Sequence, residues 1–109
     1  MIFIIGGAYQ GKTQYAMENF GEGYVVWNHY HETVRQQLLD KRNPLEEAER
    51  RLQGEDKLII IIDEVGYGLV PVEAFEREYR EAVGRVGCFL AGKAEQVIRV
   101  VSGIGQRIK

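Results

Sequence analysis

Short runs of apolar residues alternate along this chain with longer, mostly charged segments. The two most continuous runs, Ile2–Ile5 and Leu58–Ile62, end abruptly in glycines or in acidic residues. Uninterrupted, β-branched runs of this length are typical of parallel strands that are buried on both faces. We therefore predict strands at both places, with Leu58–Ile62 as a central strand, and two further strands at 24–27 and 96–101.

Helical spacing of apolar residues appears between these runs. We predict a helix from residue 11 or 12 to about 19, two helices within 30–52 that are separated before Pro44, and a long helix over 72–90. The last of these carries an apolar stripe at three- and four-residue spacing, formed by Val72, Phe75, Tyr79, Val83, Val86 and Leu90.

Strands that alternate with helices predict an α/β fold, a small and mainly parallel sheet of about four strands with helices on both faces. Residues 66–71 are expected to form a loop, and residues 103–105 a turn that leads into a basic tail ending in Arg107 and Lys109. We expect residues 1–109 to form one domain. So small a sheet leaves an edge strand open, which favours a homo-oligomer.

Composition narrows the class of protein. The chain has 109 residues, of which 45% are hydrophobic and 28% charged, as in ordinary globular proteins. The net charge of −2 argues against a nucleic-acid partner bound through bulk positive charge. Cys88 is the single cysteine, and no apolar run approaches the roughly 20 residues that span a bilayer. We expect a cytoplasmic protein with no membrane partner.

Residues 6–13 carry the clearest chemical pattern. They fit the P-loop pattern G-x-x-x-x-G-K-[ST] and lie between a predicted strand and a predicted helix, which is the context that the pattern requires. Backbone N–H groups of such a loop cradle the phosphates of ATP or GTP, Lys12 reaches the β- and γ-phosphates, and the Thr13 hydroxyl binds Mg²⁺. The alternative is a glycine-rich turn without a ligand. The predicted nucleotide-binding residues are Gly6, Gly7, Ala8, Tyr9, Gln10, Gly11, Lys12 and Thr13.

Asp63 and Glu64 follow the most apolar strand directly. Ligands of parallel α/β sheets bind at the carboxyl ends of the strands, so both carboxylates are expected beside the phosphate-binding loop. One of them, with Asp63 as our choice, would hold Mg²⁺, or one would accept the proton of an attacking hydroxyl. The alternative is that they only solvate the end of a strand.

Three other side chains are weaker candidates. His29 and His31 follow the second predicted strand, and either is a possible nucleophile toward phosphorus or an ordinary surface histidine. Arg85 on the long helix is a candidate phosphate ligand, although an exposed helix arginine is the default interpretation.

The chain also resembles a known family, the bifunctional adenosylcobinamide kinases/adenosylcobinamide-phosphate guanylyltransferases. Residues 63–71 resemble that family's segment E-V-G-x-G-[IL]-V-P, and the similarity continues through 79–80, 84–86 and 101–105, with 6–13 similar to its P-loop. The resemblance implies a P-loop parallel sheet, an oligomer, and phosphorylation of the corrinoid adenosylcobinamide by ATP or GTP in cobalamin biosynthesis. It further implies a nucleotide role for Gly11, Lys12 and Thr13, and active-site positions for Glu64 and Arg85.

The chain departs from this family between the second strand and Ile59. The family carries its guanylylated histidine there, in an H-x-x-x-R-P-like stretch that surrounds neither His29 nor His31. The sequence thus predicts a nucleotide-dependent kinase and argues against the guanylyl-transfer step. A nucleotide-binding regulatory or assembly module without transferase activity is the alternative. No N-K-x-D base-reading motif is present, so the choice between ATP and GTP stays open.

Overall fold

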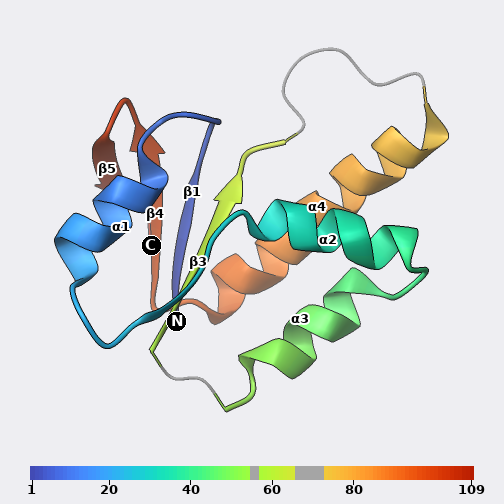
Figure 1. Cartoon of the computed structure of the whole chain (residues 1–109), viewed down its shortest axis with the longest axis horizontal. Coiled ribbons are helices and arrows are strands. Elements are labelled where there is room, and N and C mark those ends of the chain that lie inside the picture. Colours follow the sequence, from blue (N-terminus) through green and yellow to red (C-terminus); the bar gives the residue numbers. More distant parts are fainter. Residues whose placement is uncertain (55–56, 66–72) are drawn as a thin grey trace.

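The computed structural model describes residues 1–54, 57–65 and 73–109 (Figure 1). Strands and helices alternate along most of the chain, as the apolar pattern predicted. The elements are β1 (Ile2–Gly6), α1 (Lys12–Phe20), β2 (Val25–Trp27), α2 (Tyr30–Leu39), α3 (Pro44–Leu52), β3 (Leu58–Asp63), α4 (Ala74–Lys93), β4 (Gln96–Val101) and β5 (Ile104–Arg107).

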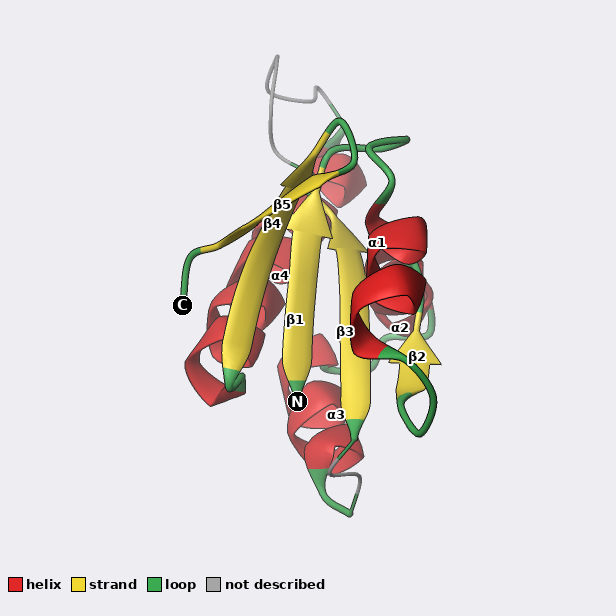
Figure 2. Ribbon diagram, turned by 90° about the vertical axis from the view of Figure 1, so that its left-hand side faces the viewer, coloured by secondary structure: helices red, strands yellow, loops and turns green. Residues whose placement is uncertain are grey.

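The strands form one sheet in the order β2-β3-β1-β4-β5 (Figure 2). The pairs β2·β3, β3·β1 and β1·β4 are parallel, and only β5 runs antiparallel, beside β4. β3 is an interior strand, as expected for its continuous apolar run, but β1 occupies the middle of the sheet. The α/β class with a mainly parallel sheet is confirmed.

The prediction of about four strands was wrong, because residues 104–107 form a fifth strand instead of part of a turn and tail. Ser102 and Gly103, with φ of 49° and 77°, make a two-residue turn that returns the chain along β4. Positive φ at both turn residues suits the twist of a tight hairpin. The basic end is also ordered: the Lys109 ammonium donates to the backbone carbonyls of Ala91 and Gly92, at 2.8 and 3.1 Å, near the end of α4.

Helices cover both faces of the sheet unequally. α1 lies on one face, where Ala16 packs over inward-facing residues of β1, β3 and β4. α2, α3 and α4 cover the other face and enclose the larger core, which includes Phe3, Ile60 and Leu90. Both views show this division (Figures 1 and 2). Successive side chains of a strand point to opposite faces of the sheet. A continuous apolar run therefore contributes side chains to both cores.

The predicted helix boundaries agree closely with the structure. The break before Pro44 is real, and the Asn43 side chain caps α3 by accepting hydrogen bonds from the backbone N–H groups of Leu45 and Glu46. The long helix begins at Ala74. Val72 and the predicted loop at 66–71 lie outside the described residues. Across the described ranges, no helix is long and apolar enough to cross a membrane.

Candidate nucleotide-binding site

The loop that matches the P-loop pattern and Asp63 lie side by side because of strand register. Gly6 and Asp63, the last residues of β1 and β3, are paired across the two parallel strands. The Glu64 N–H donates to the Gly6 carbonyl at 2.8 Å, which ties the two strand ends together. The expectation that the acidic pair would lie beside the loop is met for Asp63.

Close packing fixes the path of the loop. A Cβ atom on Gly6 would lie 2.4 Å from the carbonyl oxygen of Val100, so this position admits only glycine without a shift of β4. Gly11 has φ of 87° and directly precedes α1. Tyr9 adopts φ of 60° although it is not glycine, and its side chain is fully exposed. Positive φ in a non-glycine residue is uncommon and concentrates at functional loops.

Lys12 occupies the centre of the site. Its side chain is only 6% exposed, and its ammonium lies 2.7 Å from Asp63 Oδ1 and 2.6 Å from the Gly7 carbonyl oxygen, to which it donates. A nearly buried ammonium requires such partners, because its loss of hydration is otherwise costly. The loop thus folds around a lysine that is already held between a carboxylate and a backbone carbonyl.

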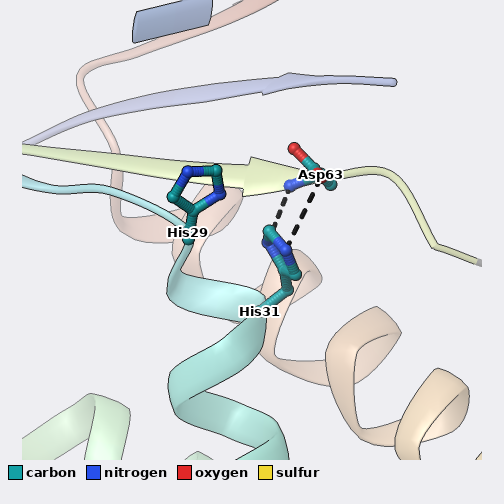
Figure 3. Close-up of side chains that lie close together, drawn as sticks. All are labelled: His29, His31 and Asp63. Atoms are coloured by element: carbon teal, nitrogen blue, oxygen red, sulfur yellow. Dashed lines mark hydrogen bonds and ion pairs between the residues drawn. The ribbon is translucent and has the colours of Figure 1, made fainter. Parts of the chain in front are cut away.

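Two histidines approach the same carboxylate from the start of α2 (Figure 3). The Asp63 N–H donates to His31 Nδ1 at 3.1 Å, and His31 Nε2 lies 3.6 Å from Asp63 Oδ2. His29 is exposed, adopts φ of 51°, and its ring lies edge-on to His31 with centroids 5.6 Å apart. Burial lowers the pKa of His31, and this outweighs the opposing effect of Asp63.

These groups line a cavity of about 390 Å³ at the carboxyl end of the sheet. Its walls come from the loop, from the first residues of α1, from Asp63 and from the start of α2, including Asn28 and Glu32. A cavity that brings together a phosphate-binding pattern, a buried lysine and a carboxylate is suited to an anion accompanied by a metal ion. Asp63 and the exposed Thr13 carry oxygen atoms of the kind that Mg²⁺ prefers as ligands.

The β4–β5 turn holds the loop from the other side. The Ser102 N–H donates to Gln10 Oε1 at 2.7 Å, and the Gly103 N–H donates to the Gln10 carbonyl at 2.8 Å. The sequence pattern predicted no role for this turn, because residues 104–107 carry no strand pattern of their own. Ser-Gly between two apolar residues was the signal in the sequence that could have indicated a two-residue hairpin turn.

The comparisons with known proteins identify the family. Residues 22–108 match the model of the family described as cobinamide kinase / cobinamide phosphate guanyltransferase. The chain belongs to this family. The predicted resemblance is therefore confirmed, and Asp63, Glu64, Arg85 and both histidines lie within the matched range, whereas Gly6–Thr13 precede it.

Two curated relatives are similar in sequence to part of this chain. The bifunctional adenosylcobalamin biosynthesis protein CobU of Salmonella typhimurium is 45% identical over 53 residues, which are 49% of this chain and 29% of that protein. CobU of Escherichia coli matches with the same identity and coverage. This member of the cobinamide kinase family thus matches less than a third of the length of either relative.

Two residues with expected active-site positions lie apart from the cavity lining. Glu64 is held by Arg99 of β4, with Oε1 3.2 Å from Arg99 Nε and Oε2 3.3 Å from Nη2. Arg85 is 71% exposed, pairs with Glu81 one turn earlier in α4, and lines a separate hollow between α4 and the α2–α3 connection. Their roles in this family member stay predictions.

Proposed function

We propose that this chain binds Mg²⁺ with ATP or GTP at Gly6–Thr13 and transfers the γ-phosphoryl group to a hydroxyl of a cobinamide-type corrinoid. The observation that carries the proposal is the placement of the nearly buried Lys12 ammonium 2.7 Å from Asp63, inside a loop with the P-loop pattern. Membership of the cobinamide kinase family supports the reaction class.

In this proposal Lys12 exchanges its contact with Asp63 for the β- and γ-phosphates, and backbone N–H groups of the loop bind the remaining phosphate oxygens. Thr13 and Asp63 would hold Mg²⁺, which would neutralise charge on the phosphates. The acceptor oxygen forms a bond to the γ-phosphorus as the bond to the β–γ bridging oxygen breaks, and a nucleoside diphosphate leaves. Positioning and electrostatics account for most of the catalysis.

The departing hydroxyl proton needs an acceptor. Asp63 is committed to Mg²⁺ in this proposal and Glu64 is engaged by Arg99, so we propose that the proton leaves on the transferred phosphoryl group or passes to water. Glu64 and Arg85 are proposed to take part only if the acceptor extends beyond the cavity, toward the outer end of β3 and toward α4. Guanylyl transfer is not part of the proposal, because neither histidine has the family's H-x-x-x-R-P-like context.

A mass measurement of the corrinoid tests the proposal. Wild type and Lys12→Ala are incubated with adenosylcobinamide, Mg²⁺ and either ATP or GTP. We expect wild type to add one phosphate with at least one of the nucleotides, and Lys12→Ala to add none, because the variant loses the cation that neutralises the γ-phosphate. A corrinoid left unchanged by wild type would refute the kinase activity, and a GMP adduct would refute our exclusion of guanylyl transfer.

A second candidate function is nucleotide binding without transfer. The specific observation in its favour is coverage: the chain matches only 29% of the curated CobU proteins, so an acceptor site elsewhere in those proteins need not have a counterpart here. Under this alternative, wild type binds nucleotide with Mg²⁺ dependence, Lys12→Ala does not, and the corrinoid is not modified.

A further inference from the structure

Strand order arranges the walls of the candidate site along the carboxyl edge of the sheet. β2, β3 and β1 are neighbours and run parallel, so the start of α2, Asp63 and the loop of residues 6–13 follow one another across this edge. Figure 3 shows the start of α2 beside the end of β3. Asp63 therefore lies between the loop on one side and residues 28–32 on the other.

This order determines the side from which a phosphoryl acceptor approaches. In-line transfer places the attacking oxygen opposite the oxygen of the leaving nucleoside diphosphate. In the proposed function the loop holds that diphosphate, so the acceptor enters from the side away from the loop, past Asp63 and against the start of α2. Asn28, His29 and Glu32 line the same cavity as the loop and form this wall of it.

Glu32 brings a negative charge to this wall. Its side chain is exposed, and within the described ranges no hydrogen bond or ion pair engages its carboxylate. A carboxylate repels the phosphates of a nucleotide, so phosphate binding does not account for it. The alternative is a purely structural role, because an acidic residue in the first turn of α2 interacts favourably with the helix dipole.

Asn28 adds a hydrogen-bond donor to the same wall. Its Oδ1 accepts from the His29 N–H at 2.9 Å, which leaves the side-chain N–H₂ group to donate to a ligand. The wall thus offers a charged acceptor and a neutral donor. A carboxamide presents the complementary pair, because its N–H₂ group donates and its carbonyl oxygen accepts. A ligand carboxylate at this place would instead be repelled by Glu32.

We infer that Glu32 and Asn28 bind the phosphoryl acceptor and select an alcohol that carries carboxamide groups over one that carries carboxylates. Glu32 makes the larger contribution, since a hydrogen bond to an ionised acceptor is roughly twice as strong as one between neutral groups. The inference rests on the proposed function, because it requires a phosphoryl acceptor in this cavity.

Steady-state kinetics separate binding of the acceptor from binding of the nucleotide. Phosphorylated corrinoid is measured by mass for wild type, Glu32→Ala and Glu32→Gln, with adenosylcobinamide and nucleotide varied in turn. We expect Glu32→Ala to raise the KM for the corrinoid about tenfold or more, and to leave the KM for the nucleotide nearly unchanged. Thermal unfolding verifies that each variant is folded.

Glu46→Ala is the matched control. Glu46 is an exposed glutamate in the first turn of α3, at the same position within its helix as Glu32 in α2, and it lies outside the cavity lining. Both glutamates interact with a helix dipole, but only Glu32 faces the cavity. We therefore expect Glu46→Ala to change neither KM.

A second acceptor tests the role of charge. A corrinoid whose peripheral amides have been hydrolysed to carboxylates should be a poorer substrate of wild type than adenosylcobinamide. Glu32→Gln removes the charge and keeps a carbonyl oxygen, so the preference for the amide form should fall about fivefold. A purely structural effect of the substitution would weaken the use of both acceptors equally.

The outcomes distinguish this inference from the proposed function. An unchanged KM for the corrinoid in Glu32→Ala, or an unchanged amide preference in Glu32→Gln, would overturn the acceptor-binding role and leave the kinase activity intact. If the KM for the nucleotide rose as much as that for the corrinoid, Glu32 would belong to the nucleotide site, and the inference would again be overturned. Absence of phosphorylated corrinoid with wild type would overturn both proposals.

Discussion

Lys12 Nζ and Asp63 Oδ1 lie 2.7 Å apart, one at the start of α1 and the other at the end of β3. The pair joins the loop after β1 to the neighbouring strand and keeps the ammonium neutralised in the absence of a ligand. In the proposed function, a phosphate that draws Lys12 away from Asp63 would leave this carboxylate available to a cation. The binding of nucleotide and Mg²⁺ is coupled through this one contact in the proposed function.

The first prediction concerns the stability of the free protein. Asp63→Asn leaves the Lys12 ammonium without its counter-charge at 6% exposure, and we expect a loss of about 1–3 kcal/mol in the free energy of unfolding. The double variant with Lys12→Met should lose less than the sum of the single changes, because it removes both charges. Urea unfolding measures all three, and additive losses would show that the contact contributes nothing.

The second prediction concerns the hydrogen bond between the Gln10 side chain and the β4–β5 turn. Gln10→Ala removes the acceptor for the Ser102 N–H, and we expect about 1 kcal/mol of lost stability together with weaker nucleotide binding. Gln36→Ala is the matched control, since this exposed side chain donates to Asp40 one turn along α2 and lies outside the cavity lining. Fluorescence titration with nucleotide compares the two variants. Equal affinities would show that the hydrogen bond between Gln10 and the turn plays no role in nucleotide binding.

The third prediction concerns the hairpin itself. A Cβ atom on Gly105 would lie 2.2 Å from the ring of Tyr15, so Gly105→Ala must displace the Tyr15 ring or β5. We expect a loss of roughly 1–3 kcal/mol, the usual cost of overpacking. Gly92→Ala in α4 meets nothing within 4 Å and should stabilise the helix by about 0.5–1 kcal/mol. If the two substitutions had similar effects on the unfolding midpoint, the contact between Tyr15 and the hairpin would be refuted.

The fourth prediction concerns pH. The pKa of His31 is lowered in the folded protein from its ordinary value of 6.5, chiefly by burial. The unfolded chain therefore binds more protons than the folded one as pH falls below 6.5, so this contribution to stability is complete above that pH and is lost on acidification. Unfolding midpoints from about pH 8 to pH 5 should fall less in His31→Gln than in wild type. If the unfolding midpoints of wild type and His31→Gln changed with pH in parallel, the predicted contribution of His31 would be contradicted.

The local pattern of apolar and polar residues was sufficient to predict most of the fold. Continuous apolar runs predicted β1 and β3, shorter apolar stretches predicted β2 and β4, helical spacing predicted α4, and Pro44 marked the boundary between α2 and α3. The hairpin strand β5 was missed because Ile104–Arg107 has two polar residues and a glycine, so it carries no strand pattern of its own. It is a strand because β4 offers an unpaired edge and because the Ser102–Gly103 turn directs the chain back along it.

The candidate site was only partly predictable. Lys12, Thr13 and Asp63 follow from the loop pattern and from the rule that ligands bind at strand ends. The contact of His31 with Asp63 did not follow, since 32 positions separate the two in the chain. Burial of the start of α2 against β3 brings them together, whereas an ordinary surface histidine was the favoured interpretation of the sequence alone.

The sequence by itself determined the α/β class and the family, because these depend on residue types at short, regular spacings. Tertiary structure alone decided which polar groups meet: Asp63 with Lys12 and His31, Glu64 with Arg99, and Gln10 with the β4–β5 turn. The physical reason is that strand register and helix packing place residues from distant segments within hydrogen-bonding or ion-pairing distance. Neither is expressed in the local pattern of any one segment.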